Sequence, residues 1–158
     1  MDQGRVLTAL SYSPKILERM LRVFPADRLD DRVEAERFTA REVMAHLADF
    51  EQVCLDRIRS AVLKPGSKVD NYDPDARAKS HSFAEKEPFH EAEVFENRRQ
   101  MTLDYVKSLT SEEMHRSFLH ASGVSYTVQE WLVMVLSHDM VHIEQVSAYL
   151  ATEVAVHS

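Results

Sequence analysis

The sequence has few of the residues that tight turns and covalent cross-links require, since its 158 residues include only three glycines and one cysteine. So few glycines leave little material for a hairpin-rich fold or for a phosphate-binding loop. Neither G-x-G-x-x-G nor G-x-x-x-x-G-K-[ST] occurs, which excludes Rossmann and P-loop proteins. The single cysteine, Cys54, excludes a disulfide within the chain and suits a reducing compartment.

Basic charge and long apolar runs are also scarce. The chain carries 19 Lys and Arg against 26 Asp and Glu, a net charge of −7. Such a chain repels the phosphate backbone, and the pair Arg98-Arg99 has acidic neighbours such as Glu96, so we expect no nucleic-acid partner. No run approaches the ~20 apolar residues of a membrane span, and no signal peptide is evident. We therefore expect a cytoplasmic protein with no membrane partner.

Apolar residues at three- and four-residue spacing predict four amphipathic helices, over residues 3–24, 39–63, 88–109 and 127–152. The second and fourth begin with the capping-box pattern, in which a threonine is followed three residues later by a glutamate. In the first segment, Pro14 cannot donate a backbone hydrogen bond, so we expect a kink or restart near Ser13.

The connections between these helices differ in length. Residues 64–88 hold three of the five prolines and little apolar content, which predicts a long loop. Ser111 with two following glutamates predicts a short extra turn, and residues 115–126 predict a connector that is partly extended. We expect an all-α fold, a four-helix bundle with a long crossover loop and short extra helical turns. We expect residues 1–152 to form a single domain, followed by a C-terminal tail over residues 153–158.

Three of the eight histidines are candidate metal ligands. His138 and His142 lie four apart and share the helix face that carries Trp131, a residue type expected inside a bundle. His46 lies on the inward stripe of the second helix and could meet the other two in the core. Three neutral imidazoles with an open position are typical of catalytic zinc, and nickel, iron or manganese also bind imidazole. Taken singly, each is interpreted as a core or boundary histidine, and only the three together indicate a metal site.

Other chemistries find less support. The spacer between His138 and His142 has no glutamate after the first histidine, which excludes the HExxH metalloprotease motif. No G-x-S-x-G elbow occurs, so a serine hydrolase site has no support. Cys54 is about 80° around the helix from His46, which predicts a small buried hydrophobic residue rather than a ligand.

Several further residues could serve a site around these histidines. Asp49 could accept a hydrogen bond from the second nitrogen of a ligand histidine, or could be a solvated helix residue. Tyr126 and Trp131 could line the mouth of a pocket, although the pattern favours plain core for Trp131. The acidic stretch around Tyr72 is interpreted as a solvated loop, with a lid over the metal as the alternative. The other histidines are expected at the surface: His81, His90, His115, His120 and His157.

Two segments resemble the DinB/YfiT-like superfamily: residues 38–51, FTAREVMAHLADFE, and residues 126–145, which begin YTVQEWL and end SHDMVHIEQ. The resemblance covers nearly the whole chain, to about Leu150. It implies a four-helix bundle with a long crossover, often as a homodimer, and a divalent zinc or nickel ion held by His46, His138 and His142. Characterised relatives include transferases that depend on a low-molecular-weight thiol, a mycothiol-dependent isomerase and hydrolases.

From the residues and the resemblance together we expect a divalent-metal-dependent enzyme acting on a small-molecule substrate. The leading hypothesis is a thiol-dependent S-transferase-like activity on small electrophiles, with a low-molecular-weight thiol as cosubstrate. Two alternatives are a metal-dependent hydrolase and a non-catalytic, stress-related, metal-binding dimeric module. An open pocket beside the histidines favours an enzyme, whereas a closed one favours the module. No catalytic residue beyond the metal ligands can be assigned from the sequence.

Overall fold

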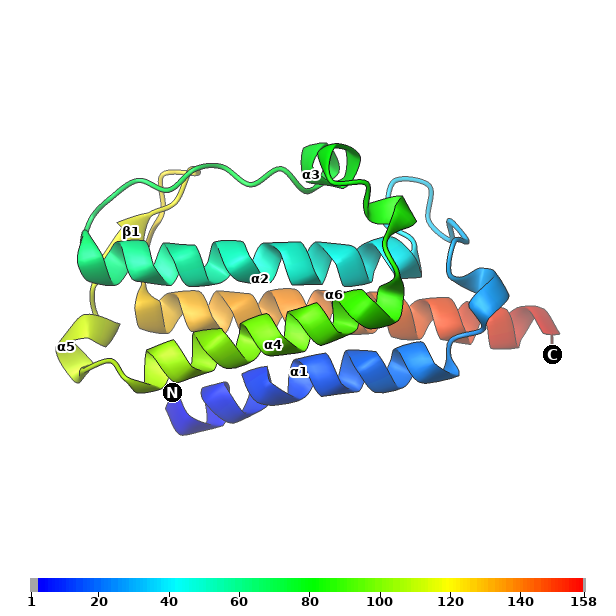
Figure 1. Cartoon of the computed structure of the whole chain (residues 1–158), viewed down its shortest axis with the longest axis horizontal. Helices are drawn as coiled ribbons and strands as arrows, with labels where there is room; N and C mark the ends of the chain where they lie inside the picture. The colour runs from blue at the N-terminus through cyan, green and yellow to red at the C-terminus, as the bar shows by residue number, and fades with distance from the viewer. Residues whose placement is uncertain (1–2, 158) are drawn as a thin grey trace.

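Four long helices form the body of the protein (Figure 1). The computed structural model describes residues 3–157, and side chains of residues 3–152. The long helices are α1 (Gln3–Val23), α2 (Ala40–Leu63), α4 (Pro88–Lys107) and α6 (Val128–His157). Helices α1 and α2 each pack against both α4 and α6, which closes the bundle around one interior. The predicted all-α bundle is therefore confirmed.

The long crossover sets the directions of the helices. After α2 the chain runs back along the whole length of that helix before α4 begins, so α2 and α4 are parallel (Figure 1). Helices α1 and α6 also run in one direction, opposite to that pair. Packing is therefore antiparallel for α1 with α4 and for α2 with α6, and parallel for α1 with α6 and for α2 with α4.

The two predicted capping boxes are present. Thr39 Oγ1 accepts from the Glu42 amide at 3.2 Å, and Glu42 Oε1 accepts from the Thr39 amide at 2.9 Å. Thr127 and Glu130 form the same reciprocal pair at 3.0 Å in both directions. Each box satisfies two backbone amides that the helix leaves without partners, so α2 and α6 begin where the sequence indicates.

Of the kink or restart expected near Ser13, the restart is wrong, because α1 is one helix with Pro14 inside it. Proline removes the amide that would pair with the carbonyl of Leu10, one turn earlier. In the structure Arg99 of α4 donates from Nη1 to that carbonyl oxygen at 2.8 Å. A side chain from another helix therefore replaces the missing backbone donor, and this contact was not visible in the local sequence.

The expectation of a long loop over residues 64–88 is also corrected, because this segment contains the helix α3 (Pro74–Ser80) and the 3-10 turn η2 (Phe83–Glu85). The carboxylate of Asp73 accepts from the amides of Asp75 and Ala76 at 3.0 and 3.3 Å, and Pro74 takes the first helical position. Both elements are too short to show an apolar period. Figure 1 shows α3 lying over α2.

The remaining connections fit the predictions more closely. Two short elements follow α4 and precede α6: the turn α5 (Ser111–Met114) and a hairpin of β1 (Ser117–Leu119) and β2 (Ser125–Thr127). A further 3-10 turn, η1 (Ala26–Arg28), follows α1. Helix α6 extends to His157, beyond the predicted end at Thr152, because no glycine or proline interrupts that stretch. In the described part of the chain, no helix is long and apolar enough to cross a membrane.

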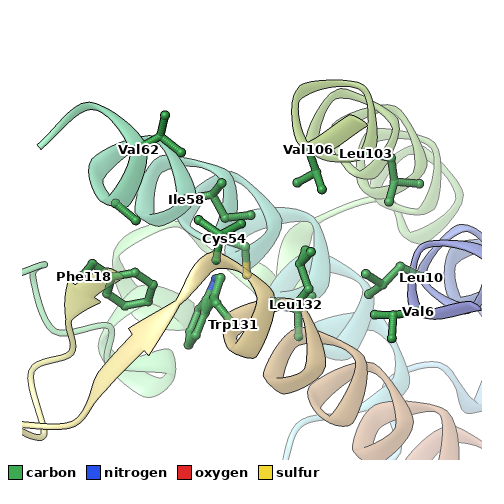
Figure 2. Close-up of a cluster of buried hydrophobic side chains, with 13 residues drawn as sticks. Val6, Leu10, Cys54, Ile58, Val62, Leu103, Val106, Phe118, Trp131 and Leu132 are labelled. Atoms are coloured by element: carbon green, nitrogen blue, oxygen red, sulfur yellow. The ribbon is translucent and has the colours of Figure 1, made fainter. Parts of the chain in front are cut away.

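The hydrophobic core has two clusters, and Figure 2 shows the one that supports the candidate site. Trp131 of α6 packs there with Phe118 of β1 and with Cys54 and Ile58 of α2. Cys54 is 1% exposed, which confirms it as a buried hydrophobic residue. Burial raises the pKa of its thiol well above the usual value, so this sulfur stays protonated.

Between the two clusters lies a buried charged group that the sequence did not predict. Arg99 is 2% exposed and donates to both carboxylates of Glu51 and Asp139, at 2.7 to 3.0 Å. Burial opposes the charge of Arg99, but the two carboxylates outweigh it and raise its pKa. The group links α1, α2, α4 and α6. Asp139 directly follows His138, so the link lies at the level of the histidines.

Candidate metal centre

Helices α2 and α6 bring the three predicted histidines together. His46 Nε2 lies 3.0 Å from His138 Nε2, and His142 Nε2 lies 3.2 Å from the same atom. The possible ligand atoms of the three residues all lie within 4.8 Å of one another. His46 is 4% exposed, and the other two are half-buried. The histidines that the sequence set apart by helix face therefore converge on one point.

Hydrogen bonds on the far side of two rings determine which nitrogens face inward without a proton. Tyr72 donates its hydroxyl to Asp49 Oδ2 at 2.8 Å, so it must accept from His46 Nδ1, which lies 3.2 Å away. In the same way, Gln145 Oε1 accepts from His142 Nδ1 at 2.9 Å. Both neutral rings therefore carry their proton on Nδ1 and turn the lone pair of Nε2 toward His138.

The Gln145 amide is itself held in one orientation. Its Nε2 donates to the hydroxyl of Tyr149 at 2.7 Å and approaches the carbonyl of Phe38 at 3.3 Å. Tyr149 in turn donates to the same carbonyl at 2.8 Å. This chain of donors leaves only the Gln145 oxygen for His142, which fixes the acceptor role used above.

Burial keeps all three imidazoles neutral near pH 7. It lowers the pKa of His46 to about 2, with the neighbouring histidines adding to the effect. It lowers the pKa of His138 to about 3, together with His142 and the charge of Arg99. The pKa of His142 also falls through burial, although its bond to Gln145 opposes the change. Neutral imidazole is the form that binds metal ions.

The donor set suits a divalent metal ion. Imidazole nitrogens bind zinc at ~2.0–2.1 Å, and two ligands of a tetrahedral ion are then ~3.3 Å apart. The two Nε2 separations of 3.0 and 3.2 Å are close to this value. Because the protons of His46 and His142 are held on Nδ1, only His138 could donate a hydrogen bond between the three rings, and it could donate to one neighbour at most. At least one Nε2 lone pair would then lack a partner, whereas a cation bound by all three lone pairs would leave none without one.

The role expected for Asp49 is corrected by the structure. Asp49 does not bond directly to a candidate ligand; Tyr72 lies between it and His46. The carboxylate also accepts from Nη2 and Nε of Arg77 at 2.6 and 3.0 Å. Burial alone would raise the pKa of Asp49, but the bonds from Arg77 and Tyr72 outweigh it and lower the pKa. Asp49 is therefore an ionised acceptor that orients Tyr72.

Tyr72 is the functional residue that the sequence interpretation underweighted. It lies in the crossover, before α3, and its ring centroid is 4.8 Å from that of Phe50 and 5.9 Å from that of His46. Burial and the Asp49 carboxylate both raise the pKa of its hydroxyl, which keeps the proton in place. At Tyr72 the segment therefore covers the site, as in the alternative interpretation of a lid, and is not a solvated loop.

A cavity of about 410 Å³ opens beside the three histidines. Tyr126 and Trp131 both line it, as expected, and Trp131 also belongs to the core. His120 lines it as well and is half-buried, so the expectation that it lies at the surface is corrected. The hairpin turns its ring toward Tyr126, with centroids 5.9 Å apart.

Three of the other histidines predicted at the surface are exposed: His81, His90 and His115. The side chain of the remaining one, His157, lies outside the described side chains.

Comparison with known proteins places the chain in a family. A sequence model of the DinB superfamily matches residues 9–146. The chain belongs to the DinB superfamily. Among curated proteins, none matches the chain. The family resemblance drawn from the two histidine segments is thereby confirmed over most of the sequence.

Several solved structures share the fold at low sequence identity. YfiT from Bacillus subtilis, described as a probable metal-dependent hydrolase with an unusual four-helix bundle topology, superposes with a TM-score of 0.91. It is 18% identical, over 97% of this chain and 90% of that one. A protein from Exiguobacterium sibiricum, described as a putative member of the DinB family, gives a TM-score of 0.56 at 17% identity, over 96% of this chain and 91% of that one.

A third structure is larger than this protein. The mycothiol-dependent maleylpyruvate isomerase superposes with a TM-score of 0.74 at 15% identity. The match covers 90% of this chain and 60% of that one, so this protein corresponds to little more than half of the isomerase. At these identities the likeness shows a common fold, and the chemistry must be argued from the residues.

Proposed function

We propose that this protein is a divalent-metal-dependent enzyme that transfers a low-molecular-weight thiol to small electrophiles. His46, His138 and His142 would hold the ion. The observation that carries the proposal is the set of imidazoles whose outer hydrogen bonds turn the Nε2 lone pairs of His46 and His142 toward His138. When bound, the ion would act as a Lewis acid and lower the pKa of a coordinated thiol or water.

The residues around the histidines supply the rest of the site. Phe50 and Trp131 give the cavity aromatic walls, which suit a weakly hydrated electrophile and keep bulk water away. Tyr72 and Gln145 hold two of the rings in the ligating tautomer. In the transfer itself, the thiol sulfur forms a bond to the electrophilic carbon, the leaving group departs with the bonding electrons, and the thiol proton passes to solvent.

Metal-dependent hydrolysis is the second candidate function, and one observation favours it. The structure superposes on YfiT, which is described as a probable metal-dependent hydrolase, with a TM-score of 0.91. The same donor set would then activate water in place of a thiol. The mycothiol-dependent isomerase, at a TM-score of 0.74, supports the thiol reaction instead.

A non-catalytic metal-binding module has less support. Structural zinc sites have four protein ligands and no space for a further group. Here the described residues place three candidate donors within reach of one ion, and a cavity of about 410 Å³ adjoins them. The open side of the donor set supports an enzyme. Zinc and nickel are the proposed metals, because imidazole suits both.

Metal content and thiol transfer test the proposal together. Untagged protein should contain close to one divalent ion per chain by elemental analysis, and His138→Ala should lose it. The metal-loaded protein should then conjugate bacillithiol, mycothiol or glutathione to a chloronitroaromatic electrophile. His90→Ala is the matched control, because His90 is exposed on α4 and should leave metal content and rate unchanged. Absence of stoichiometric metal from the wild-type protein would refute the proposal.

Assembly and location remain proposals as well. We propose a homodimer, as the superfamily resemblance implies, and a cytoplasmic protein without a nucleic-acid partner. Met134 and Val141 are exposed at 43% and 53% and lie seven residues apart on one face of α6, which offers an apolar contact surface. Sedimentation velocity at micromolar concentration tests the dimer, and a single monomeric species would contradict it.

A further inference from the structure

Arg57 is a buried cation without a carboxylate partner at the wall of the cavity. The residue is 4% exposed, and it lines the same cavity as the three histidines. Its one hydrogen bond to the described residues runs from Nη2 to the backbone carbonyl of Asp70 at 3.0 Å. Within residues 3–152, no side chain forms an ion pair with it.

The other buried arginine shows what this environment normally requires. Arg99 is compensated by two carboxylates, from Glu51 and Asp139. Arg57 instead lies against two aromatic rings: its guanidinium carbon is 5.2 Å from the Trp131 ring centroid and 6.0 Å from that of Phe50. Burial lowers the pKa of Arg57 more than the exposed Asp70 carboxylate raises it. A buried charge of this kind is costly unless a counter-charge arrives from outside.

The position of Arg57 places that counter-charge on a ligand of the candidate site. Arg57 follows His46 by eleven residues, about three helical turns, so both point from the same face of α2, with their Cα atoms ~16 Å apart along the axis. Trp131 precedes His138 by seven residues on α6 and lies opposite Arg57. The cavity therefore has a histidine end and a cationic end, joined by aromatic walls.

A second donor lies close to the cationic end. His120 Nδ1 accepts from the Ser122 amide at 3.0 Å, so the neutral ring carries its proton on Nε2. Burial and the charge of Arg57 lower the pKa of His120, which keeps it neutral. A neighbouring hollow also borders Arg57, but its lining carries charges of both signs, such as Asp56 and Lys68, and includes none of the three candidate ligands.

We propose that Arg57 anchors a carboxylate of the small-molecule ligand, so that the site acts on molecules with a compact anionic group at one end and the reacting group at the other. This assignment deepens the proposed function and rests on it for the reaction, but the anion site itself needs no metal. The carboxylate could belong to the electrophile or to the thiol cosubstrate. Arg57 is a specificity-determining residue on this proposal.

The test compares two ligands of one shape that differ in charge, phenylacetate and phenylacetamide. Trp131 is the only tryptophan and lines the cavity, so its fluorescence reports binding directly. Full-length protein freed of metal with a chelator should bind phenylacetate about 10- to 100-fold more tightly than the amide, as expected for a hydrogen-bonded ion pair. Arg57→Met should bind the two alike, and Arg57→Lys should keep part of the preference.

Arg59→Met is the matched control. Arg59 lies two residues further along α2, and its guanidinium carbon packs on Tyr105 of α4, 5.5 Å from the ring centroid, so the substitution removes the same charge away from the cavity. The preference should survive in this variant. Equal binding of both ligands by the wild-type protein would overturn the proposal, and so would a preference that persists in Arg57→Met or that appears only after metal is added.

A second arm identifies the source of the carboxylate. Metal-loaded protein is titrated with 3-mercaptopropionate and with 2-mercaptoethanol, which carry the same thiol with and without a carboxylate. A preference for 3-mercaptopropionate that Arg57→Met removes would support the proposal and assign the anion to the thiol. An absent thiol preference, with the phenylacetate preference intact, would support it and assign the anion to the electrophile. If the wild-type protein proved to bind no stoichiometric metal, the proposed function would be refuted, but the phenylacetate experiment on metal-free protein would be unaffected.

Discussion

Arg99 Nη1 donates to the carbonyl oxygen of Leu10 at 2.8 Å, and this carbonyl is the one that Pro14 leaves without an intrahelical partner. A proline inside a helix normally costs about 3 kcal/mol, in part through that lost hydrogen bond. Arg99 lies on α4 and is already fixed by Glu51 and Asp139. The buried ion group and the continuous first helix are therefore parts of one arrangement.

Replacing Arg99 should destabilise the whole bundle. Arg99→Met leaves two buried carboxylates and one carbonyl without a donor, so we expect the free energy of unfolding to fall by ~3–5 kcal/mol, measured in urea. Arg99→Lys keeps the charge but not the planar fork and should lose less. Arg98→Met is the control: within the described residues Arg98 donates only to the carbonyl of Ala48, so its loss should cost ~1 kcal/mol. Equal losses for the two methionine variants would contradict this account.

The sequence predicted those parts of the fold whose signals are local and repeated. The capping boxes at Thr39 and Thr127 and the apolar period placed α2 and α6, and helix faces alone brought His46 toward His138 and His142. The residues left the metal open among zinc, nickel, iron and manganese, and the thiol and the dimer came only from the resemblance, so all of these stay proposals. The identity of the metal, the thiol and the partner subunit depends on contacts that the local sequence pattern does not encode.

The parts that the sequence missed depend on contacts between distant segments. Pro14 indicated an interruption of the first helix. That prediction failed because the donor that compensates for the proline, Arg99, comes 85 residues later in the sequence. Tyr72 lies in a segment without period, and only the return of the crossover along α2 brings its hydroxyl to His46. Arg57 looked like one more charged helix residue until burial distinguished it. The hydrogen-bond partner of His142 could have been predicted, because Gln145 follows His142 by three residues and therefore lies one turn away on the same helix face.

Removing the hydroxyl of Tyr72 should weaken metal binding. Tyr72→Phe leaves His46 Nδ1 without its acceptor, so the ring is no longer held in the tautomer that presents Nε2. We expect a 10- to 100-fold loss of zinc affinity, measured by competition with a chromophoric chelator. The fold should be unchanged by circular dichroism.

Tyr126→Phe is the matched control for this variant. Tyr126 lines the same cavity, but no hydrogen bond joins its hydroxyl to a histidine in the described part of the site. Zinc affinity should therefore be that of the wild-type protein. If both tyrosine variants lose affinity equally, the effect comes from the cavity wall and not from orientation of His46.

Arg77 should hold α3 over the site. Its guanidinium donates two hydrogen bonds to Asp49 of α2, yet the side chain is 38% exposed, so the pair contributes little to global stability. We expect Arg77→Met to leave the unfolding midpoint nearly unchanged and to raise hydrogen exchange several-fold in residues 72–80, measured by mass spectrometry. Lys79→Met, an exposed substitution on the same helix, should change neither quantity. Unchanged exchange in Arg77→Met would mean that α3 is held by other contacts.

The metal-free protein should lose stability as the solution becomes acidic. The folded state lowers the pKa of His46 to about 2 and of His138 to about 3, whereas an unfolded histidine titrates near 6.5. Between these values the unfolded chain binds more protons, so stability is complete above pH ~6.5 and falls as the pH drops below it. Each such histidine contributes a slope of at most ~1.4 kcal/mol per pH unit.

Urea unfolding of the metal-free protein at pH 7, 6 and 5 measures this slope. Because His46 stays neutral when folded throughout that range, His46→Gln should reduce the number of protons taken up on unfolding by up to one and flatten the dependence on pH. His90→Gln removes an exposed histidine instead and should leave the slope of the wild-type protein. A slope that is the same in all three proteins would show that His46 is protonated in the folded state, and the neutral cluster on which the metal site rests would then be wrong.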